Sequence, residues 1–517
     1  MSSTSGESPS FSQRLLNVVE KAGNALPNPV TLFILLAGLV VLLSAWLSAA
    51  GVQVVHPGTG KVVTVVNLLT VEGLHRMITG ALPNFINFAP LGLVLVCLIG
   101  LAVAEHSGLI GAVLRVIVLT TPPRFLTAVV VFCGTLSHTG SDVGYVLLIP
   151  LSAALFHTVG RHPLAGLAAA FAGVSGGFAA NILLSTSDVL LSAMTQEAAR
   201  LLQPTYTVTP MSNYYFLAVS VFLIVGVGTW ITERMVEPRL GAYTGGVKKE
   251  PMTPLAPRER RGLWSAAAAA LGLTLVILAG LIPETGFLRD PAHPGVLQSY
   301  FIKAFVFFIF LYGLVVGVTY GVVAGTIRND HDVIQGMTKA MQSVGGYIVL
   351  AFFVAQFVSY FGWTNLAVVL AVEGAEFLRH LDLGAIPLMG AFVVLAAIID
   401  LALGSASAKW AVMAPIFVPM FMLLGYSPEM AQAAYRIGDS TMNVVTPLMS
   451  YFPLILTFVQ RYDPKAGIGT LVAMMLPYSL LFLAGWMLML IIWILVGLPL
   501  GPNAPLFLPG PVPATAP

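Results

Sequence analysis

The chain has very little charge. Only 9% of its 517 residues are Asp, Glu, Lys or Arg, and the formal net charge at pH 7 is +2. Soluble domains carry about 25% charged residues, so this composition excludes an ordinary soluble fold. The small net charge gives no indication of a nucleic-acid partner. Cysteine is also scarce: Cys97 and Cys133 both lie in apolar runs, which predicts buried free thiols and no disulfide framework.

Several motifs of pumps and enzymes are missing as well. No Gly-Lys-Ser/Thr loop for binding phosphates is present, which argues against a nucleotide-driven pump within this chain. No nucleophile–base motif stands out, and His138 and His157 lack the spacing of metal ligands. We therefore expect no enzyme, no metal site and no cofactor other than a coupling ion, H⁺ or Na⁺. A membrane-embedded enzyme that uses paired aspartates is kept as a further hypothesis.

What the chain has in abundance is long apolar sequence. Hydrophobic residues make up 57% of it, the mean hydropathy is +0.90, and several runs exceed the ~20 residues that span a bilayer as a helix. This predicts an all-α polytopic membrane protein. The predicted spans are 30–50, 85–104, 125–137 continued at 145–156, 214–231, 263–282, 301–327, 344–361, 386–402, 410–424 and 471–496, with two further apolar segments at 164–191 and 431–456.

Loop charge predicts the orientation. The loop 234–261 carries seven Lys or Arg residues against three acids, and short positive loops stay in the cytoplasm. The predicted organisation is therefore a cytoplasmic N-terminal segment (1–25), a first membrane half (26–233), this basic loop (234–261), a second half (262–500) and a Pro-rich tail (501–517) that we expect to be disordered.

The two further apolar segments repeat each other. At an offset of 265 residues, 11 of 42 positions from Pro150 onward are identical without a gap, and Pro, Gly and Ser recur among them. Paired apolar segments that are interrupted by Gly and Pro indicate the substrate site of a secondary transporter. We expect a hairpin at about 164–188 and another at about 431–456. An inverted pair is favoured, and a parallel repeat stays open.

Ionisable residues inside these apolar segments are the first candidates for function. Arg436 and Asp439 are three residues apart, so on a helix they share one face and can form an ion pair. Alternatively, Gly438 breaks the helix there, and Arg436 offers its planar guanidinium to a substrate carboxylate.

Two other aspartates have two interpretations each. Asp188 follows a Ser-Thr-Ser run and suits a Na⁺ or H⁺ site, or it starts the next helix. Asp400 lies deep in an apolar run, where it acts as a proton carrier or pairs with Lys409. Trp410 either stacks on an aromatic ligand or anchors the chain at the membrane interface. Asp142 lies in a polar island and can gate, pair or bind ions.

At these residues the chain resembles the AbgT family, the p-aminobenzoyl-glutamate transporters. The resemblance covers nearly the whole length and is densest in four motifs. These are 141–151 (SDVGYVLLIPL), 170–178 (AFAGVSGGF) running on into Asn181 and 185–188, 404–415 (GSASAKWAVMAP) and 435–440 (YRIGDS).

The resemblance implies a homodimer in a bacterial inner membrane, with about nine spanning helices and two re-entrant hairpins per protomer in an inverted repeat. It implies transport of p-aminobenzoyl-glutamate, a folate breakdown product, and for some members export of sulfonamide drugs. Another dicarboxylate, such as citrate or a C4-dicarboxylate, is the alternative substrate. In one departure, this chain has Asp400 where the family usually has Asn. The predicted substrate site is Trp410, Ser407, Arg436, Pro428 and Asn181, and the predicted ion-coupling site is Asp188, Asp439, Asp400, Ser440 and Asn443, with Na⁺ possible at Asp188 or Asp439.

Overall fold

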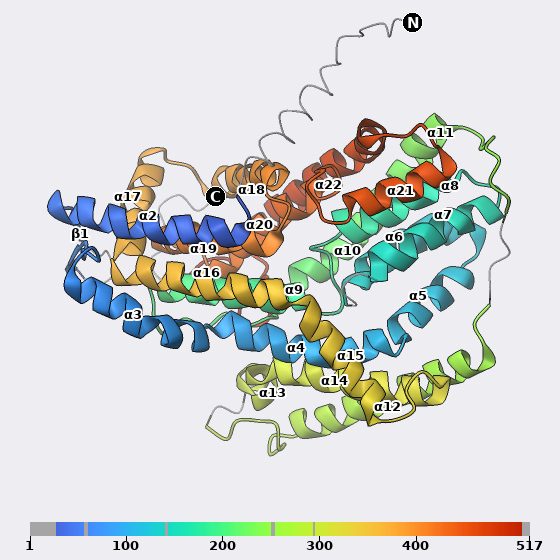
Figure 1. The fold of residues 1–517 in the computed structure, drawn as a ribbon, viewed down its shortest axis with the longest axis horizontal. Helices are drawn as coiled ribbons and strands as arrows, with labels where there is room; N and C mark the ends of the chain where they lie inside the picture. The colour runs from blue at the N-terminus through green and yellow to red at the C-terminus, as the bar shows by residue number, and fades with distance from the viewer. Residues whose placement is uncertain (1–26, 56–59, 140–142, 250–253, 293–294, 509–517) are drawn as a thin grey trace, which may run out of the picture.

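The computed structural model describes residues 27–55, 60–139, 143–249, 254–292 and 295–508. They form an elongated bundle of helices, most of which run along its long dimension (Figure 1). A two-stranded antiparallel sheet, β1 (Gln53–Val55) with β2 (Val62–Thr64), lies at one end of the bundle. In the described residues, nine helices or continuous helix pairs are long and apolar enough to cross a membrane. The predicted all-α polytopic fold is confirmed.

The helices divide into an outer set and a core set. The outer set is α2 (Pro29–Ala49), α3 (Val71–Ile86), α4 (Ala89–His106), α5 (Leu109–Leu119), α10 (Tyr214–Ile231), α11 (Glu237–Leu240), α12 (Pro257–Leu281), α13 (Tyr300–Lys303), α14 (Phe305–Ala324), α15 (Asp330–Ser343), α16 (Gly345–Trp363), α17 (Leu366–His380) and α22 (Ile468–Val496). The core set is α6 (Leu126–Leu136), α7 (Ile149–Thr158), α8 (Pro163–Phe171), α9 (Thr186–Arg200), α18 (Ala385–Ala402), α19 (Ala406–Leu423), α20 (Pro428–Met442) and α21 (Phe452–Tyr462).

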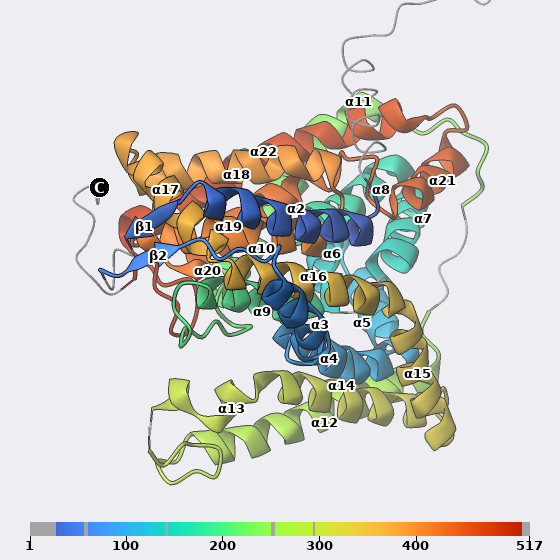
Figure 2. The same cartoon turned by 60° about the vertical axis from the view of Figure 1, so that its left-hand side comes forward.

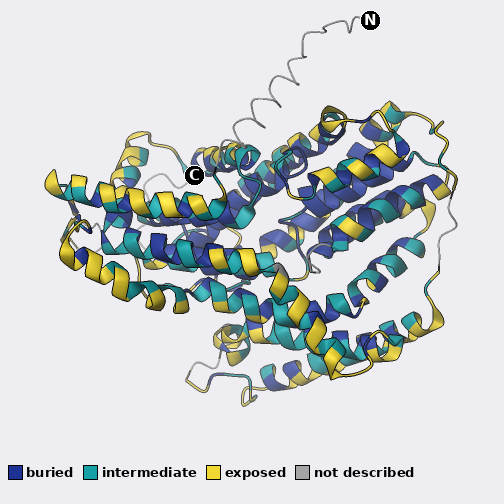
Figure 3. Cartoon of the chain, viewed as in Figure 1, coloured by how far each residue is buried: buried dark blue, intermediate teal, exposed yellow. Residues whose placement is uncertain are grey.

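Burial separates the two sets (Figure 3). Only 17% of the most apolar window of α2 is buried inside the protein, and the same holds for α12. Such apolar, little-buried helices are stable when lipid covers them. By contrast, every residue of α8 is buried, and so is every residue of α20. The core set is therefore enclosed by protein.

Two re-entrant hairpins precede the repeat blocks. In the first, formed by α6 and α7, Arg161 just after α7 donates a hydrogen bond of 2.8 Å to Thr127 at the start of α6. In the second, formed by α18 and α19, Phe392 near the start of α18 packs on Phe421 near the end of α19, with ring centroids 5.0 Å apart. Each hairpin enters and leaves at one end. The first does so at the end that carries loop 234–261 (the basic end), and the second at the opposite end (the far end), as Figures 1 and 2 show.

The repeat blocks themselves are broken helices that cross the bundle. α8 continues as a π-helical turn (Ala172–Gly176), the helix stops at 177–185, and α9 carries the chain onward to the far end. α20 and α21 run in the reverse direction, with their break at 443–451. The contacts that establish this antiparallel arrangement are, along the first block, Ser175 with Met449, Asp188 with Arg436, and Thr195 with Gln432.

The predicted hairpin positions, about 164–188 and about 431–456, are therefore wrong, whereas the inverted repeat is confirmed. The physical reason is that Gly and Pro interrupt a helix in the same way whether the chain then turns back or continues. The repeat also reaches the turns before each block, because Gly160 and Gly425 both have positive φ, +84° and +89°. Both end a helix in a conformation that glycine adopts without a steric cost.

Two other sequence expectations need correction. The segments 109–119 and 366–380 were not among the predicted spans, yet they form α5 and α17. The tail was expected to be disordered from residue 501, but its first part is packed: Leu506 is buried, its carbonyl accepts a hydrogen bond from Ser427 N at 3.0 Å, and Phe507 pairs with Tyr426. Residues 1–25 and Asp142, for which we made predictions, lie outside the described residues.

Candidate substrate and ion site

The site lies where the two broken helices cross. α9 begins beside the first break, and its first turn is closed by a capping box: Ser185 N and Ser185 Oγ donate to Asp188 Oδ2 at 2.7 and 2.8 Å. The predicted role of this segment as a helix start is confirmed, although Ser185 is the N-cap and Asp188 is the third residue of the helix. A carboxylate here is stabilised by the helix dipole and by backbone N–H groups.

Asp188 also forms a buried ion pair with Arg436. Arg436 Nη2 donates to Asp188 Oδ1 at 2.5 Å, and both side chains are at most 2% exposed. Asn181, inside the first break, donates to the other carboxylate oxygen at 3.4 Å. The predicted pair of Arg436 with Asp439 is therefore wrong, because the neighbouring broken helix supplies a carboxylate that the sequence spacing does not show.

A second charged cluster lies one helical turn further along α20. Lys409 Nζ is 2.6 Å from Asp439 Oδ1, and Lys409 also forms an ion pair with Asp400. The hydroxyl of Tyr435 donates to Asp439 at 3.2 Å and to the carbonyl of Ala406 at 2.5 Å. Pairing of Asp400 with Lys409, one of the two interpretations of Asp400, is confirmed. Lys409 thus connects the tip of the second hairpin to α20.

Gly438 does not break α20, which runs as one helix from Pro428 to Met442. A Cβ atom at this position would overlap the carbonyl oxygen of Val393 on α18. Gly438 is therefore explained by the close approach of two helices, and the expected break falls later, at 443–451. Gly173 has the same role in the first block, where a Cβ would overlap the carbonyl of Val131 on α6.

Trp410 is a buried core residue and not an interfacial anchor. Its ring stacks on Tyr435, with centroids 4.4 Å apart and an interplanar angle of 27°. Its Nε1–H donates to Thr195 on α9 at 2.9 Å, and the Thr195 hydroxyl donates to Gln432 at 2.6 Å. Trp410 is thereby fixed between the two repeat blocks, in the conformation that the chain adopts here.

The other predicted site residues surround this crossing. Ser407 lies in the first turn of α19, Pro428 is the first residue of α20, and Asn443 is its C-cap. Three polar atoms at the crossing are buried without a hydrogen-bond partner in the described residues: Asn181 Oδ1, Arg436 Nε and Ser440 Oγ. Such atoms are uncommon in native structures, and a site that receives a ligand or an ion accounts for them.

Sequence analysis missed some residues of the site. Lys409 was considered only as a partner for Asp400, and Tyr435, Thr195 and Gln432 were not singled out. Tyr435 and Asp439 are four residues apart, so helical spacing was a usable signal for that pair. No comparable signal existed for Thr195, because its partners lie more than 200 residues away in the chain.

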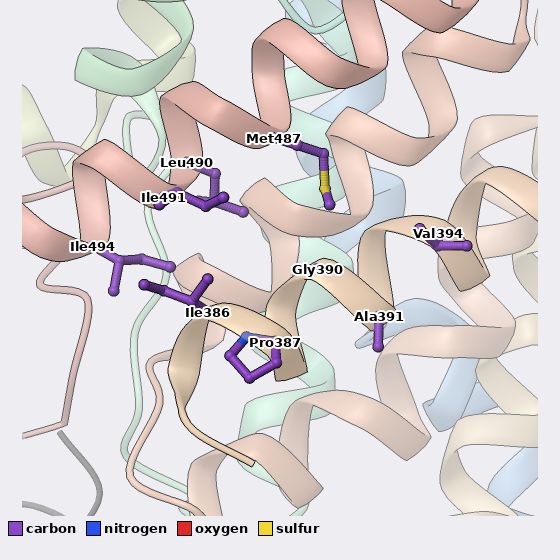
Figure 4. Close-up of a pocket in the computed structure, with 9 residues that line it drawn as sticks. All are labelled: Ile386, Pro387, Gly390, Ala391, Val394, Met487, Leu490, Ile491 and Ile494. Atoms are coloured by element: carbon purple, nitrogen blue, oxygen red, sulfur yellow. The ribbon is translucent and has the colours of Figure 1, made fainter. Parts of the chain in front are cut away.

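The site is closed to solvent in this conformation: Asp188, Asp400, Lys409 and Trp410 all have 0% exposure. Two cavities in the described residues lie elsewhere. One, of about 480 Å³, is lined by apolar side chains of α18 and α22, including Pro387, Val394 and Met487 (Figure 4). The other, of about 590 Å³, lies at the basic end beside Arg239 and Asp463.

Paired broken helices that cross antiparallel, with re-entrant hairpins before them and charged groups buried at the crossing, define a multi-pass membrane transporter. The model of the AbgT putative transporter family matches residues 14–508, and the chain belongs to this family.

Individual relatives are similar over almost the entire chain. A p-aminobenzoyl-glutamate transport protein of Escherichia coli K12 is 42% identical over 503 residues, which cover 97% of this chain and 99% of the relative. The structure of the Alcanivorax borkumensis YdaH transporter matches with a TM-score of 0.88 and 44% identity, over 92% of this chain and 100% of that one. The structure of Neisseria gonorrhoeae MtrF, described within a class of antimetabolite efflux pumps, matches with a TM-score of 0.91 and 46% identity, over 95% and 100%.

Proposed function

We propose that the chain is a secondary active transporter that moves p-aminobenzoyl-glutamate across the membrane, coupled to a cation gradient. The observation that carries this proposal is the state of Arg436. One of its nitrogens holds Asp188, while its Nε is buried without a hydrogen-bond partner in the described residues. A guanidinium with an open side, next to two aromatic rings, suits a ligand that has both a carboxylate and an aromatic ring.

Binding would proceed by exchange of carboxylates. When the crossing opens, a glutamate carboxylate of the substrate takes the place of Asp188 on Arg436 and occupies the planar fork. The aminobenzoyl ring then inserts beside Trp410 and Tyr435, which stack on each other while the site is closed. Asn181, Ser407 and Pro428 line the approach as further substrate contacts.

Charge explains why a cation must accompany the substrate. Once displaced, Asp188 is a carboxylate without its partner in a site of low dielectric, where an unpaired charge costs several kcal/mol. A coupling cation, H⁺ or Na⁺, removes that cost at Asp188, Asp400 or Asp439. Ser440 and Asn443 add neutral oxygen atoms beside Asp439 on the same helix end.

Export of sulfonamide-type drugs is a second activity, favoured by the similarity to MtrF. A sulfonamide has an aminobenzene-like ring but lacks the glutamate, so it would use Trp410 and depend less on Arg436. A loss of both activities to the same extent in Arg436→Ala would contradict this division of roles.

The proposed location is the bacterial inner membrane, with the N-terminus and loop 234–261 in the cytoplasm. The charge of that loop supports this orientation. We further propose a homodimer. Exposed apolar side chains on α3, including Leu74, Ile78 and Leu82, form a ridge that lipid or a second copy can cover. Native mass spectrometry in detergent would distinguish a dimer from a monomer.

The test is uptake of radiolabelled p-aminobenzoyl-glutamate into proteoliposomes, with H⁺ and Na⁺ gradients imposed separately. Accumulation under one gradient identifies a coupled carrier and its ion. Unlabelled citrate, succinate and a sulfonamide serve as competitors. Competition by citrate without any uptake of the labelled compound would favour the alternative dicarboxylate substrate.

Two variants sharpen this test. Arg436→Ala should abolish uptake of the glutamate conjugate. Arg234→Ala, at an exposed position of the basic end, is the matched control and should retain it. Uptake that survives in Arg436→Ala would contradict the proposed binding mode.

A further inference from the structure

The charges buried at the crossing do not balance. Three carboxylates, Asp188, Asp400 and Asp439, meet two cationic side chains, Lys409 and Arg436, and all five are at most 2% exposed. With every group ionised, one negative charge is left over. A buried carboxylate without a counter-charge is neutralised in practice, because desolvation of the ion is so costly. The closed site therefore holds one more positive charge than its side chains supply.

Two of the three carboxylates are well solvated by the protein. Asp188 accepts from Arg436, from the backbone and hydroxyl of Ser185, and from Asn181. Asp439 accepts from Tyr435 and pairs with Lys409. Donors of this kind stabilise the ionised form of a carboxyl group.

Asp400 has a poorer environment. Beyond the contact with Lys409, which it shares with Asp439, no described residue donates a hydrogen bond to either of its oxygens. Its side chain lies at the last turn of α18, against α20, α19 and α22. Among the three carboxylates, it gains least from being ionised.

The elements packed around Asp400 offer no further counter-charge. α19 contributes Lys409, and α20 contributes Asp439, Tyr435 and Arg436, of which Arg436 is engaged by Asp188. α22 carries no charged residue, and its one tyrosine, Tyr478, has its hydroxyl bonded to Thr232. The titratable groups Cys97 and His138 interact with Asp188 instead.

We propose that Asp400 carries a proton in the closed site, as a neutral carboxylic acid beside Lys409, and that this proton is the coupling ion. The side chains then form two complete ion pairs, Asp188 with Arg436 and Asp439 with Lys409, plus one neutral acid. When the crossing opens to water, the O–H bond of Asp400 breaks, the proton leaves to the aqueous phase, and the carboxylate remains beside Lys409. The identity of the ion deepens the proposed function and rests on it, whereas the protonation of Asp400 does not.

Infrared spectroscopy of the purified protein tests the protonation without any substrate. The C=O stretching band of a protonated carboxylic acid should be present in the native protein near neutral pH. It should be absent from Asp400→Asn and retained in Asp188→Asn. Asp382→Asn is the matched control, because Asp382 lies at an exposed turn with positive φ, which Asn also adopts. Absence of the band from the native protein, or its persistence in Asp400→Asn, would overturn the proposal.

Transport measurements test the coupling. With a gradient of about one pH unit, loss of one coupled proton should lower the accumulation ratio of Asp400→Asn by about tenfold, while exchange of labelled for unlabelled substrate continues. Asp400→Glu keeps an acid and should keep most of the pH dependence, which separates a titrating role from a purely structural one. Undiminished accumulation by Asp400→Asn would reject the coupling role. If the native protein accumulates no substrate under any gradient, the proposed function fails, and the infrared result still decides the state of Asp400.

Discussion

The two halves of the core share a backbone plan but differ in charge. Each has a re-entrant hairpin, a turn at a glycine with positive φ and a helix broken at mid-length. At the offset of 265 residues, the second half places charged side chains where the first half has neutral ones: Asp400 for Thr135, Lys409 for Gly144, Arg436 for Phe171 and Asp439 for Val174. The repeat therefore supplies the geometry of the crossing, and substitutions within one copy supply its chemistry.

Aromatic residues show the same division. Tyr145 and Trp410 are equivalent at this offset, and each stacks on another ring with centroids 4.4 Å apart, Tyr145 on Tyr451 and Trp410 on Tyr435. Only the second stack has the charged groups Arg436 and Asp439 on the same helix as its tyrosine. A planar contact is thus common to both halves, whereas a planar contact beside a guanidinium belongs to the second.

The largest expected effect comes from removing the charge of the second half. Arg436→Ala should lower uptake of p-aminobenzoyl-glutamate by at least about 100-fold, because truncation of one partner of a buried charge pair costs 2–5 kcal/mol. Phe171→Leu, at the equivalent position of the first half, should keep most of the uptake. Proteoliposome uptake measures both.

A double variant separates binding from stability in this prediction. Adding Asp188→Asn to Arg436→Ala removes the carboxylate that would be left unpaired, so the melting temperature should recover while uptake does not. Recovery of uptake in the double variant would show that Arg436 acts only as a structural partner of Asp188.

The next effect should be equal in the two halves. Gly173→Ala and Gly438→Ala should each destabilise the protein by about 1–3 kcal/mol, because the added methyl group overlaps a carbonyl of the adjacent hairpin. Thermal unfolding in detergent measures this. Gly226→Ala on α10 is the control, since nothing lies within 4 Å of its added carbon. A loss confined to one of the two variants would show that the hairpins are not packed equivalently.

A smaller effect is expected at the aromatic stacks. Trp410→Phe should raise the KM for p-aminobenzoyl-glutamate by about 2- to 10-fold, as expected from the 0.5–1.5 kcal/mol of an aromatic pair. Tyr145→Phe keeps its stack and lies outside the charged half, so its KM should stay close to the native value. Equal increases in both variants would place the substrate ring between the halves and not in the second.

The smallest effect concerns the hydroxyl of Ser440, which is buried without a hydrogen-bond partner in the described residues. Ser440→Ala should change stability by less than about 0.5 kcal/mol, because no bond is lost. If the coupling ion is a proton, its accumulation ratio should also be unchanged. A selective loss of Na⁺-driven uptake would identify Ser440 as a Na⁺ ligand and contradict proton coupling through Asp400. Ser175→Ala, the equivalent position, is the comparison.

Sequence analysis predicted the features that repeat and missed those that depend on tertiary contacts. The internal repeat located both broken helices, because interruptions by Gly and Pro are local. It did not distinguish a break from a reversal, since that depends on which element the next helix packs against. The partner of Arg436 was missed because Asp188 is 248 residues away, while a chemically adequate partner, Asp439, was three residues away. Gly438 was misinterpreted because a helix break and a close helix contact favour the same residue.

The bonds between the tail and α20 have a consequence for the order of synthesis. Residues 500–508 contact Tyr426 and Ser427 at the start of α20, yet the ribosome makes them after α21 and α22. During translation, the second broken helix must therefore wait in the membrane without these bonds. The corresponding start of α8 obtains its partner Glu237, bonded to Arg161, before any residue of the second half exists. The first crossing helix can thus be secured early and serve as a template on which the later one docks.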